Sequence, residues 1–124
     1  MVFNLLQVAV GGAIGASLRY SAGLALARFS SVSFPIAVMS VNILGSFLMG
    51  CCVVIAMERN LTHLQPLVMT GVLGGFTTFS TFSLEAFTLF ENGQTATAGL
   101  YVLLSVALSL LAISVGILLA RCIV

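Results

Sequence analysis

Charged residues are so rare in this chain that they divide it into long uncharged stretches. Of its 124 residues, only four are basic and three are acidic. A soluble domain with about 25% charged residues would carry roughly 31. The seven charges fall at Arg19, Arg28, Glu58, Arg59, Glu85, Glu91 and Arg121. With 60% hydrophobic residues and a mean hydropathy of +1.25, the chain has too little polar surface for a water-soluble globule. We therefore expect it to lie in a lipid bilayer.

The uncharged intervals predict four transmembrane helices, because a spanning helix needs about 20 mainly apolar residues. The expected spans are residues 5–27, 36–57, 66–90 and 96–120, which form a single domain over residues 1–124. Residues 28–35, with their serines and Pro35, form the first loop. The sequence Glu91-Asn92-Gly93 is typical of a helix end and turn. The predicted fold is thus an all-α membrane protein.

Several functional classes are excluded by what remains outside these spans. The short loops leave no room for a soluble catalytic domain. A net charge of +1 without a basic cluster argues against nucleic-acid binding. The sequence has no nucleotide-binding motif, metal-ligand cluster or convincing pair of nucleophile and base. We therefore expect neither an enzyme nor a nucleic-acid partner.

Basic residues give the chain only a weak preference for one orientation in the membrane. One side would carry Arg59, Arg121 and the terminal amine, and the other Arg28 and, if its side chain reaches that way, Arg19. Such a balanced chain need not insert in one direction. We therefore predict dual topology, with antiparallel pairing of two copies.

The third span contains an unusual cluster of small and hydroxyl residues. Gly74 and Gly75 precede residues 77–83, and five of those seven residues are serine or threonine. This pattern predicts a helix broken near the membrane midplane, where irregular backbone is tolerated only in a buried site or a cavity. The freed carbonyls could hold a cation. The alternative is an ordinary helix whose hydroxyls bond to its own backbone.

Aromatic residues recur at every third position of this segment, at Phe76, Phe79 and Phe82. On a regular helix they would follow one side as a slowly drifting stripe. The edge of an aromatic ring carries partial positive charge, so ring edges beside a polar path could favour a small anion. The alternative is ordinary packing.

Polar residues inside the other spans are further candidates. Asn42 lies among apolar neighbours, and either lines a pore or forms an interhelical hydrogen bond. Arg19 and Glu85 are intramembrane charges, which mark functional sites by default. Arg19 could attract an anion, reach the interface or pair with a carboxylate. Glu85 could couple to protons or form a structural hydrogen bond. A possible polar track, or simply hydroxyl packing, follows one face of the fourth span at Tyr101, Ser105 and Ser109.

Three motifs together resemble the Fluc (CrcB) family of small fluoride channels. They are residues 11–20 (GGAIGASLRY), 41–45 (VNILG) and 74–83 (GGFTTFSTFS). The resemblance covers essentially the whole chain. It implies an antiparallel dual-topology homodimer in the bacterial inner membrane, with two fluoride pores and a sodium ion at the centre of the interface. It also implies passive fluoride export that protects against fluoride toxicity.

The same resemblance implies a role for individual residues. Phe79 and Phe82 would supply ring edges to the pore, and Asn42 an amide donor. The backbone carbonyls of Gly74 and Thr77 would bind sodium. Arg19 would lie at the aqueous vestibule, and the remaining pore residues would be Ser80, Thr81, Ser83, Glu85, Tyr101, Ser105 and Ser109. The chain departs from many relatives at Val38, where they carry threonine.

Two other classes compete with this interpretation. A small multidrug-type transporter also uses four short helices in an antiparallel dimer, but needs a membrane carboxylate, usually in the first helix. Here Glu85 would have to serve alone. A structural subunit without transport activity would explain the glycines but not the hydroxyl cluster.

Overall fold

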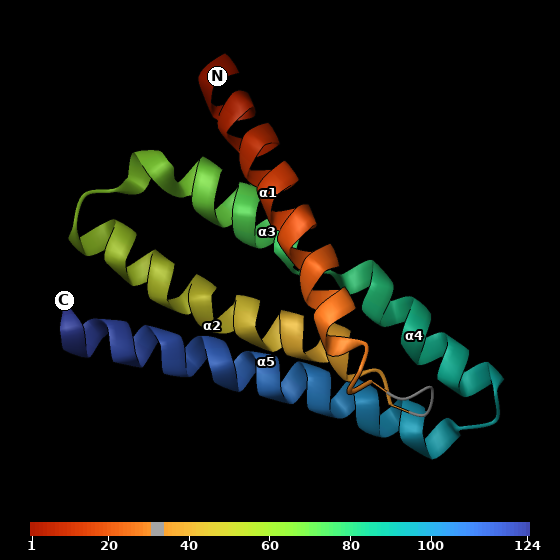
Figure 1. Ribbon diagram of the computed structural model, residues 1–124. Coiled ribbons are helices and arrows are strands. Elements are labelled where there is room, and N and C mark those ends of the chain that lie inside the picture. Colours follow the sequence, from red (N-terminus) through yellow and green to blue (C-terminus); the bar gives the residue numbers. More distant parts are fainter. Residues whose placement is uncertain (31–33) are drawn as a thin grey trace.

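The computed structural model describes residues 1–30 and 34–124, and those residues form helices joined by short connections, without a strand (Figure 1). Four apolar helical segments are long enough to cross a membrane, so the chain is a multi-pass membrane protein and the predicted four-helix architecture is confirmed. The segments are Val2–Leu26, Ile36–Glu58, Thr62–Glu91 and Thr95–Ile123. Residues 31–33 of the expected first loop lie outside the described residues.

The first, second and fourth segments are the continuous helices α1 (Val2–Leu26), α2 (Ile36–Glu58) and α5 (Thr95–Ile123). The third is divided into shorter elements. These are a 3₁₀ turn η1 (Thr62–Leu64), a π-helix η2 (Pro66–Leu73), one α-helical turn α3 (Gly74–Phe76) and the helix α4 (Phe79–Glu91).

The predicted interruption of the third span is confirmed and lies between α3 and α4. Thr77 has φ −79° and ψ 158°, and Thr78 has φ −151° and ψ 122°, so both residues are extended. The ribbon loses its helical coil at this point, and α4 begins beyond the non-helical connection (Figure 1). The break also corrects the expectation of one phenyl stripe, because Phe76 lies on the other side of it from Phe79 and Phe82.

Glycines allow backbone contact between α1 and the first part of the third span, and between α2 and α5. α1 crosses η2 and α3 where a Cβ on Gly15 would overlap the Val72 carbonyl oxygen, and a Cβ on Gly75 would lie 2.8 Å from the Gly12 carbonyl oxygen. Small residues allow such close approach between membrane helices. α2 and α5 run side by side (Figure 1) and touch in the same way at Gly50 and Gly116.

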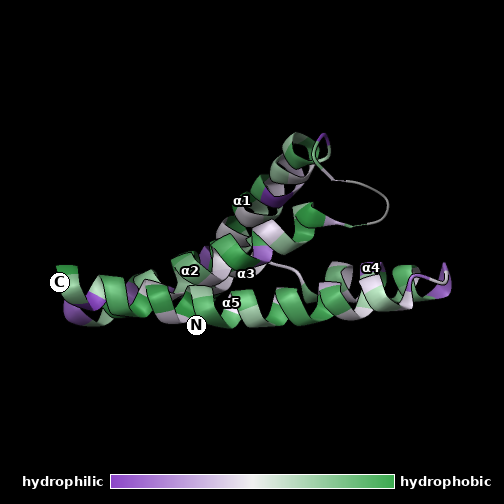
Figure 2. Ribbon diagram, turned by 90° about the horizontal axis from the view of Figure 1, so that it is seen from below, coloured by the Kyte–Doolittle hydropathy of each residue, from purple (hydrophilic) through white to green (hydrophobic). Residues whose placement is uncertain are grey.

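Polar residues gather away from the apolar lengths of the helices. In Figure 2 most of α5 is hydrophobic, whereas hydrophilic residues mark its C-terminal end and the turn between α4 and α5. At the end of the bundle that holds this turn, Phe82, Leu89, Ala98 and Tyr101 form a buried cluster. Val38 packs against it. Val38 therefore places an apolar side chain against an apolar cluster.

Candidate functional site at the broken helix

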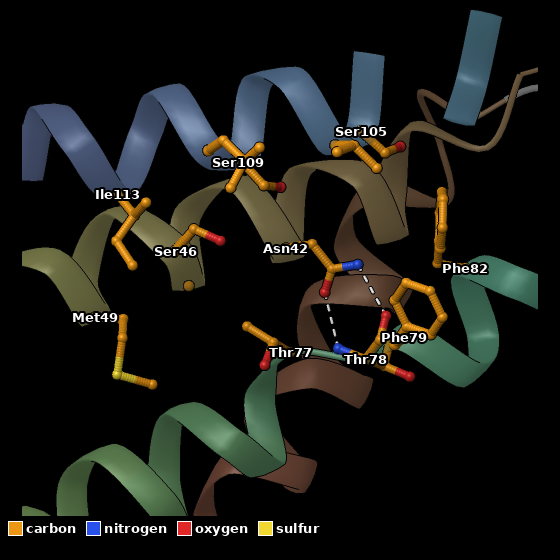
Figure 3. A pocket seen from close by; sticks show the side chains of 13 residues that line it. Asn42, Ser46, Met49, Thr77, Thr78, Phe79, Phe82, Ser105, Ser109 and Ile113 are labelled. Atoms are coloured by element: carbon orange, nitrogen blue, oxygen red, sulfur yellow. Dashed lines mark hydrogen bonds between the residues drawn. The ribbon is translucent and has the colours of Figure 1, made fainter. Parts of the chain in front are cut away.

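A cleft of about 350 Å³ opens beside the break in the third span. Side chains from α2, from the break, from α4 and from α5 line it (Figure 3). Six of the residues singled out from the sequence meet there: Asn42, Thr77, Phe79, Phe82, Ser105 and Ser109. They come from three of the four spans, so the fold brings together a site that is dispersed in the sequence.

The Asn42 side chain binds the backbone at the break. Its Nδ2 donates to the Thr78 carbonyl oxygen at 2.8 Å, and its Oδ1 accepts from the Thr78 backbone N–H at 2.8 Å (Figure 3). Both polar groups of one extended peptide position are thereby satisfied, which a buried backbone requires. The interhelical hydrogen bond is thus present, and it uses one of the two N–H donors of the Asn42 amide.

The same contacts free two backbone carbonyls. In a continuous helix the Thr78 N–H would donate to the Gly74 carbonyl, and the Thr81 N–H to the Thr77 carbonyl. Here the Thr78 N–H donates to Asn42, and the Thr81 N–H donates to the Thr78 hydroxyl at 3.3 Å. Gly74 and Thr77 therefore lose their helical donors, so their carbonyl oxygens have capacity for a cation.

Thr78 is a site residue that the sequence analysis did not single out by itself. It is 7% exposed and forms the N-cap of α4, with its hydroxyl 3.1 Å from that of Thr81 and 3.4 Å from that of Ser80. A threonine directly before a helix is a recognised N-cap signal. The signal was not specific here, because each of the five serine and threonine residues in 77–83 could cap a helix.

The two phenyl rings of α4 lie together at the cleft but differ in exposure. Their centroids are 5.4 Å apart, with a tilt of 53° between the ring planes. Phe82 is 6% exposed and lies 5.3 Å from the Tyr101 ring, whereas Phe79 is 76% exposed. Phe82 is thus fixed in the core, and Phe79 presents its ring at the surface of the single chain.

Behind Phe82, Tyr101 and Glu85 form a pair. The Tyr101 hydroxyl donates to Glu85 Oε2 at 2.7 Å, and Tyr101 is fully buried. Phe34 meets the Tyr101 ring edge-on at 5.8 Å. The structural hydrogen bond considered for Glu85 is therefore present.

The serines of α5 differ in their hydrogen bonding. Ser105 is 5% exposed, and its hydroxyl has no hydrogen-bond partner in the described part of the chain. Ser109 follows one turn later on the same wall (Figure 3). A buried hydroxyl without a partner costs free energy, so its presence beside a cleft favours a ligand or water as partner.

The other sequence-predicted residues are not among the described residues that line the cleft. Ser80 and Ser83 are exposed on α4, and the Ser83 hydroxyl donates to the Phe79 carbonyl at 2.9 Å. The Thr77 hydroxyl similarly donates to the Leu73 carbonyl at 2.9 Å. The alternative of hydroxyls bonding to their own helix therefore holds for these two residues. Arg19 is half-buried on α1.

The cleft offers amide, hydroxyl and aromatic-edge groups at membrane depth, together with carbonyls freed by the break. Among residues 1–30 and 34–124, no group of three histidine, cysteine or acidic side chains could hold a metal ion. Neutral donors of this kind can replace part of the hydration shell of an ion without binding it too tightly to leave. Four apolar spans and this cleft define a small helical membrane protein with uncharged polar groups inside its spans, an arrangement that suits the passage of an ion.

Comparison with known proteins agrees with that class. The family model described as CrcB-like protein, Camphor Resistance (CrcB), matches residues 6–117. A protein from a Ruegeria species named fluoride-specific ion channel FluC is 57% identical over 122 residues, which cover 98% of this chain and 97% of the relative. Proteins of the same name from Roseobacter denitrificans and Agrobacterium fabrum are 58% and 43% identical over 120 and 122 residues, covering 95% and 97% of this chain and 95% and 98% of the relatives.

The chain belongs to the CrcB family. The resemblance inferred from the three sequence motifs is therefore confirmed. Membership of this family favours an ion channel over the multidrug-type transporter and the structural subunit.

Proposed function

We propose that this chain is a fluoride-selective ion channel that lets fluoride leave the cell passively and so protects it from fluoride toxicity. The observation that carries the proposal is the cleft beside the broken helix, where Asn42, Phe79, Phe82, Ser105 and Ser109 meet. The names of the relatives at 57% and 58% identity support fluoride as the ion.

The chemistry of the cleft suits a small, strongly hydrated anion. Weak donors follow one another here: the second N–H of the Asn42 amide, the Phe79 and Phe82 ring edges, and the Ser105 hydroxyl, which has no partner among the residues that the structure describes. Fluoride is smaller than chloride and accepts stronger hydrogen bonds. A narrow row of such donors therefore offsets the cost of removing water from fluoride better than it offsets that cost for chloride. Beyond the cleft, Glu85, Tyr101, Thr81, Ser83 and Ser80 would extend the polar path, and Arg19 would attract the anion at the vestibule.

A second copy of the chain would complete this site as an antiparallel dual-topology homodimer. In a single chain Phe79, Gly74, Ser80 and Ser83 are exposed near the break. Polar backbone groups facing lipid are costly because the bilayer core has no water to satisfy them. Burial of the break against its counterpart in a second copy removes that cost.

A sodium ion bound where the two breaks meet would bridge the subunits. The Gly74 and Thr77 carbonyls that lost their helical donors are suited to hold it, two from each subunit, since sodium prefers oxygen ligands. The positive charge would hold the two breaks together and offset anion repulsion. A bacterial inner membrane is the expected location of the dimer.

The direct test is ion efflux from liposomes that contain the purified protein, with a potassium ionophore to dissipate the voltage that flux builds. We expect rapid fluoride efflux and negligible chloride efflux. Absence of fluoride efflux from verified folded dimers would refute the channel function. Terminal reporters on both membrane faces would support dual topology, and reporters on one face only would contradict it.

A further inference from the structure

We propose that one turn of α2, from Asn42 to Gly45, sets the position of the break in the third span. In this turn Gly45 is a positioning residue for Thr77. The proposal rests on the fluoride-channel function for its consequence in transport. Its structural core does not depend on that function. The two contacts join residues far apart in the sequence: Thr77 follows Gly45 by 32 positions, and Thr78 follows Asn42 by 36.

Gly45 makes room for the side chain of Thr77. A Cβ placed on Gly45 would overlap the Thr77 Cγ2 methyl and would lie 3.7 Å from Thr77 Cβ. Gly45 is buried, and the next nearest side chain, Phe76 Cδ1, would be at an ordinary contact distance of 3.4 Å. The Thr77 methyl is therefore the group that requires glycine here.

Thr77 has little freedom to move away from a larger residue. Its hydroxyl donates to the Leu73 carbonyl at 2.9 Å, which fixes the rotamer that directs the methyl at Gly45. Its side chain is β-branched, so rotation about χ1 is restricted as well. A methyl group on residue 45 would therefore displace the Thr77 backbone or break its hydroxyl bond.

Asn42 holds the next residue of the break from the same turn. Asn42 and Gly45 are three positions apart and so lie on one face of α2. Asn42 fixes Thr78 by two hydrogen bonds, while the absence of a side chain on Gly45 leaves space for the methyl of Thr77. One rigid turn thus controls both extended residues, including the Thr77 carbonyl proposed for sodium and the start of α4 that carries Phe79.

The test measures the effect of Gly45→Ala in two backgrounds, the parent chain and the Thr77→Ser variant. Serine keeps the hydroxyl but lacks the methyl that an alanine Cβ would meet. In the parent chain we expect Gly45→Ala to lower the unfolding midpoint by about 5–15 °C, as overpacking does, and to abolish most fluoride efflux. In the Thr77→Ser background the same substitution should have a much smaller effect on both.

Two control substitutions separate this fit from general effects of losing a glycine. Gly50→Ala would meet the Ile113 backbone, so Thr77→Ser should not relieve its effect. A Cβ on Gly99 meets no atom within 4 Å among the described residues, so Gly99→Ala reports on helix propensity alone. If Gly45→Ala yields no folded protein, recovery of folded dimer by added Thr77→Ser gives the same answer.

Equal effects of Gly45→Ala in both backgrounds, or no effect in either, would overturn the proposal. The unfolding measurement does not use fluoride. If the parent chain conducts no fluoride, the proposed function fails, but the coupling between residues 45 and 77 still decides whether this turn positions the break.

Discussion

The side-chain amide of Asn42 and the backbone of Thr78 form a two-bond clamp between α2 and the broken third span. Its two hydrogen bonds, each 2.8 Å long, replace the pairing that an uninterrupted helix would give Thr78. The clamp makes the break a defined structure and leaves the Gly74 and Thr77 carbonyls without their helical donors.

Loss of the clamp should weaken both folding and transport. Asn42→Ala removes both bonds of the clamp and leaves the buried Thr78 N–H without its acceptor, and a buried unsatisfied group costs about 1–3 kcal/mol. We expect a lower unfolding midpoint and strongly reduced fluoride efflux. Leu44→Ala, an exposed neighbour on the same helix, is the control and should change both much less. Parental stability together with parental efflux for Asn42→Ala would contradict the role of the clamp.

Ser105 should matter for transport more than for folding. Its buried hydroxyl has no partner among the described residues, so Ser105→Ala removes no hydrogen bond that stabilises the chain. We expect an unfolding midpoint at or above that of the parent, with slower fluoride efflux. The matched change Ser114→Ala removes an exposed hydroxyl bonded to the Leu110 carbonyl and should leave efflux unchanged. Parental efflux in Ser105→Ala would remove this hydroxyl from the ion path.

The hydrogen bond between Tyr101 and Glu85 should, in contrast to the Ser105 hydroxyl, matter for folding stability. Tyr101→Phe keeps the ring contacts with Phe82 but removes the 2.7 Å bond to Glu85, and a hydrogen bond to a charged group contributes about 1.5–3 kcal/mol. The unfolding midpoint should therefore fall, and efflux should fall with it if the pair continues the polar path. Tyr20→Phe, on an exposed tyrosine, controls for loss of a phenol. An unchanged midpoint for Tyr101→Phe would show that the bond contributes nothing to stability.

The sequence predicted much of this fold because the bilayer imposes a simple rule on composition. Uncharged intervals between residues such as Arg28 and Glu58 were enough to identify the spans, and Gly74 and Gly75 before a hydroxyl cluster were enough to predict the break. The π-helix η2 could not be predicted, since its mainly apolar residues carry no period that distinguishes it from an α-helix.

The site was harder to predict because its contacts are not local. Thr78 was not singled out since its main partner, Asn42, is 36 residues away. Phe79 is exposed and Phe82 is buried. This difference in exposure follows from the position of the break at Thr77 and Thr78. The roles assigned to these residues in fluoride and sodium binding stay predictions.

The central claim is that fluoride crosses the membrane along the cleft beside the break, and Phe79 tests it most directly. Because its ring is exposed in the single chain, Phe79→Ile removes little packing within the subunit. The control is Phe87→Ile, which changes another exposed phenyl two turns further along α4. Fluoride and chloride efflux should be measured for both variants in liposomes with equal amounts of verified dimer. The account predicts loss of fluoride efflux in Phe79→Ile and parental efflux in Phe87→Ile; parental fluoride efflux in both variants would contradict it.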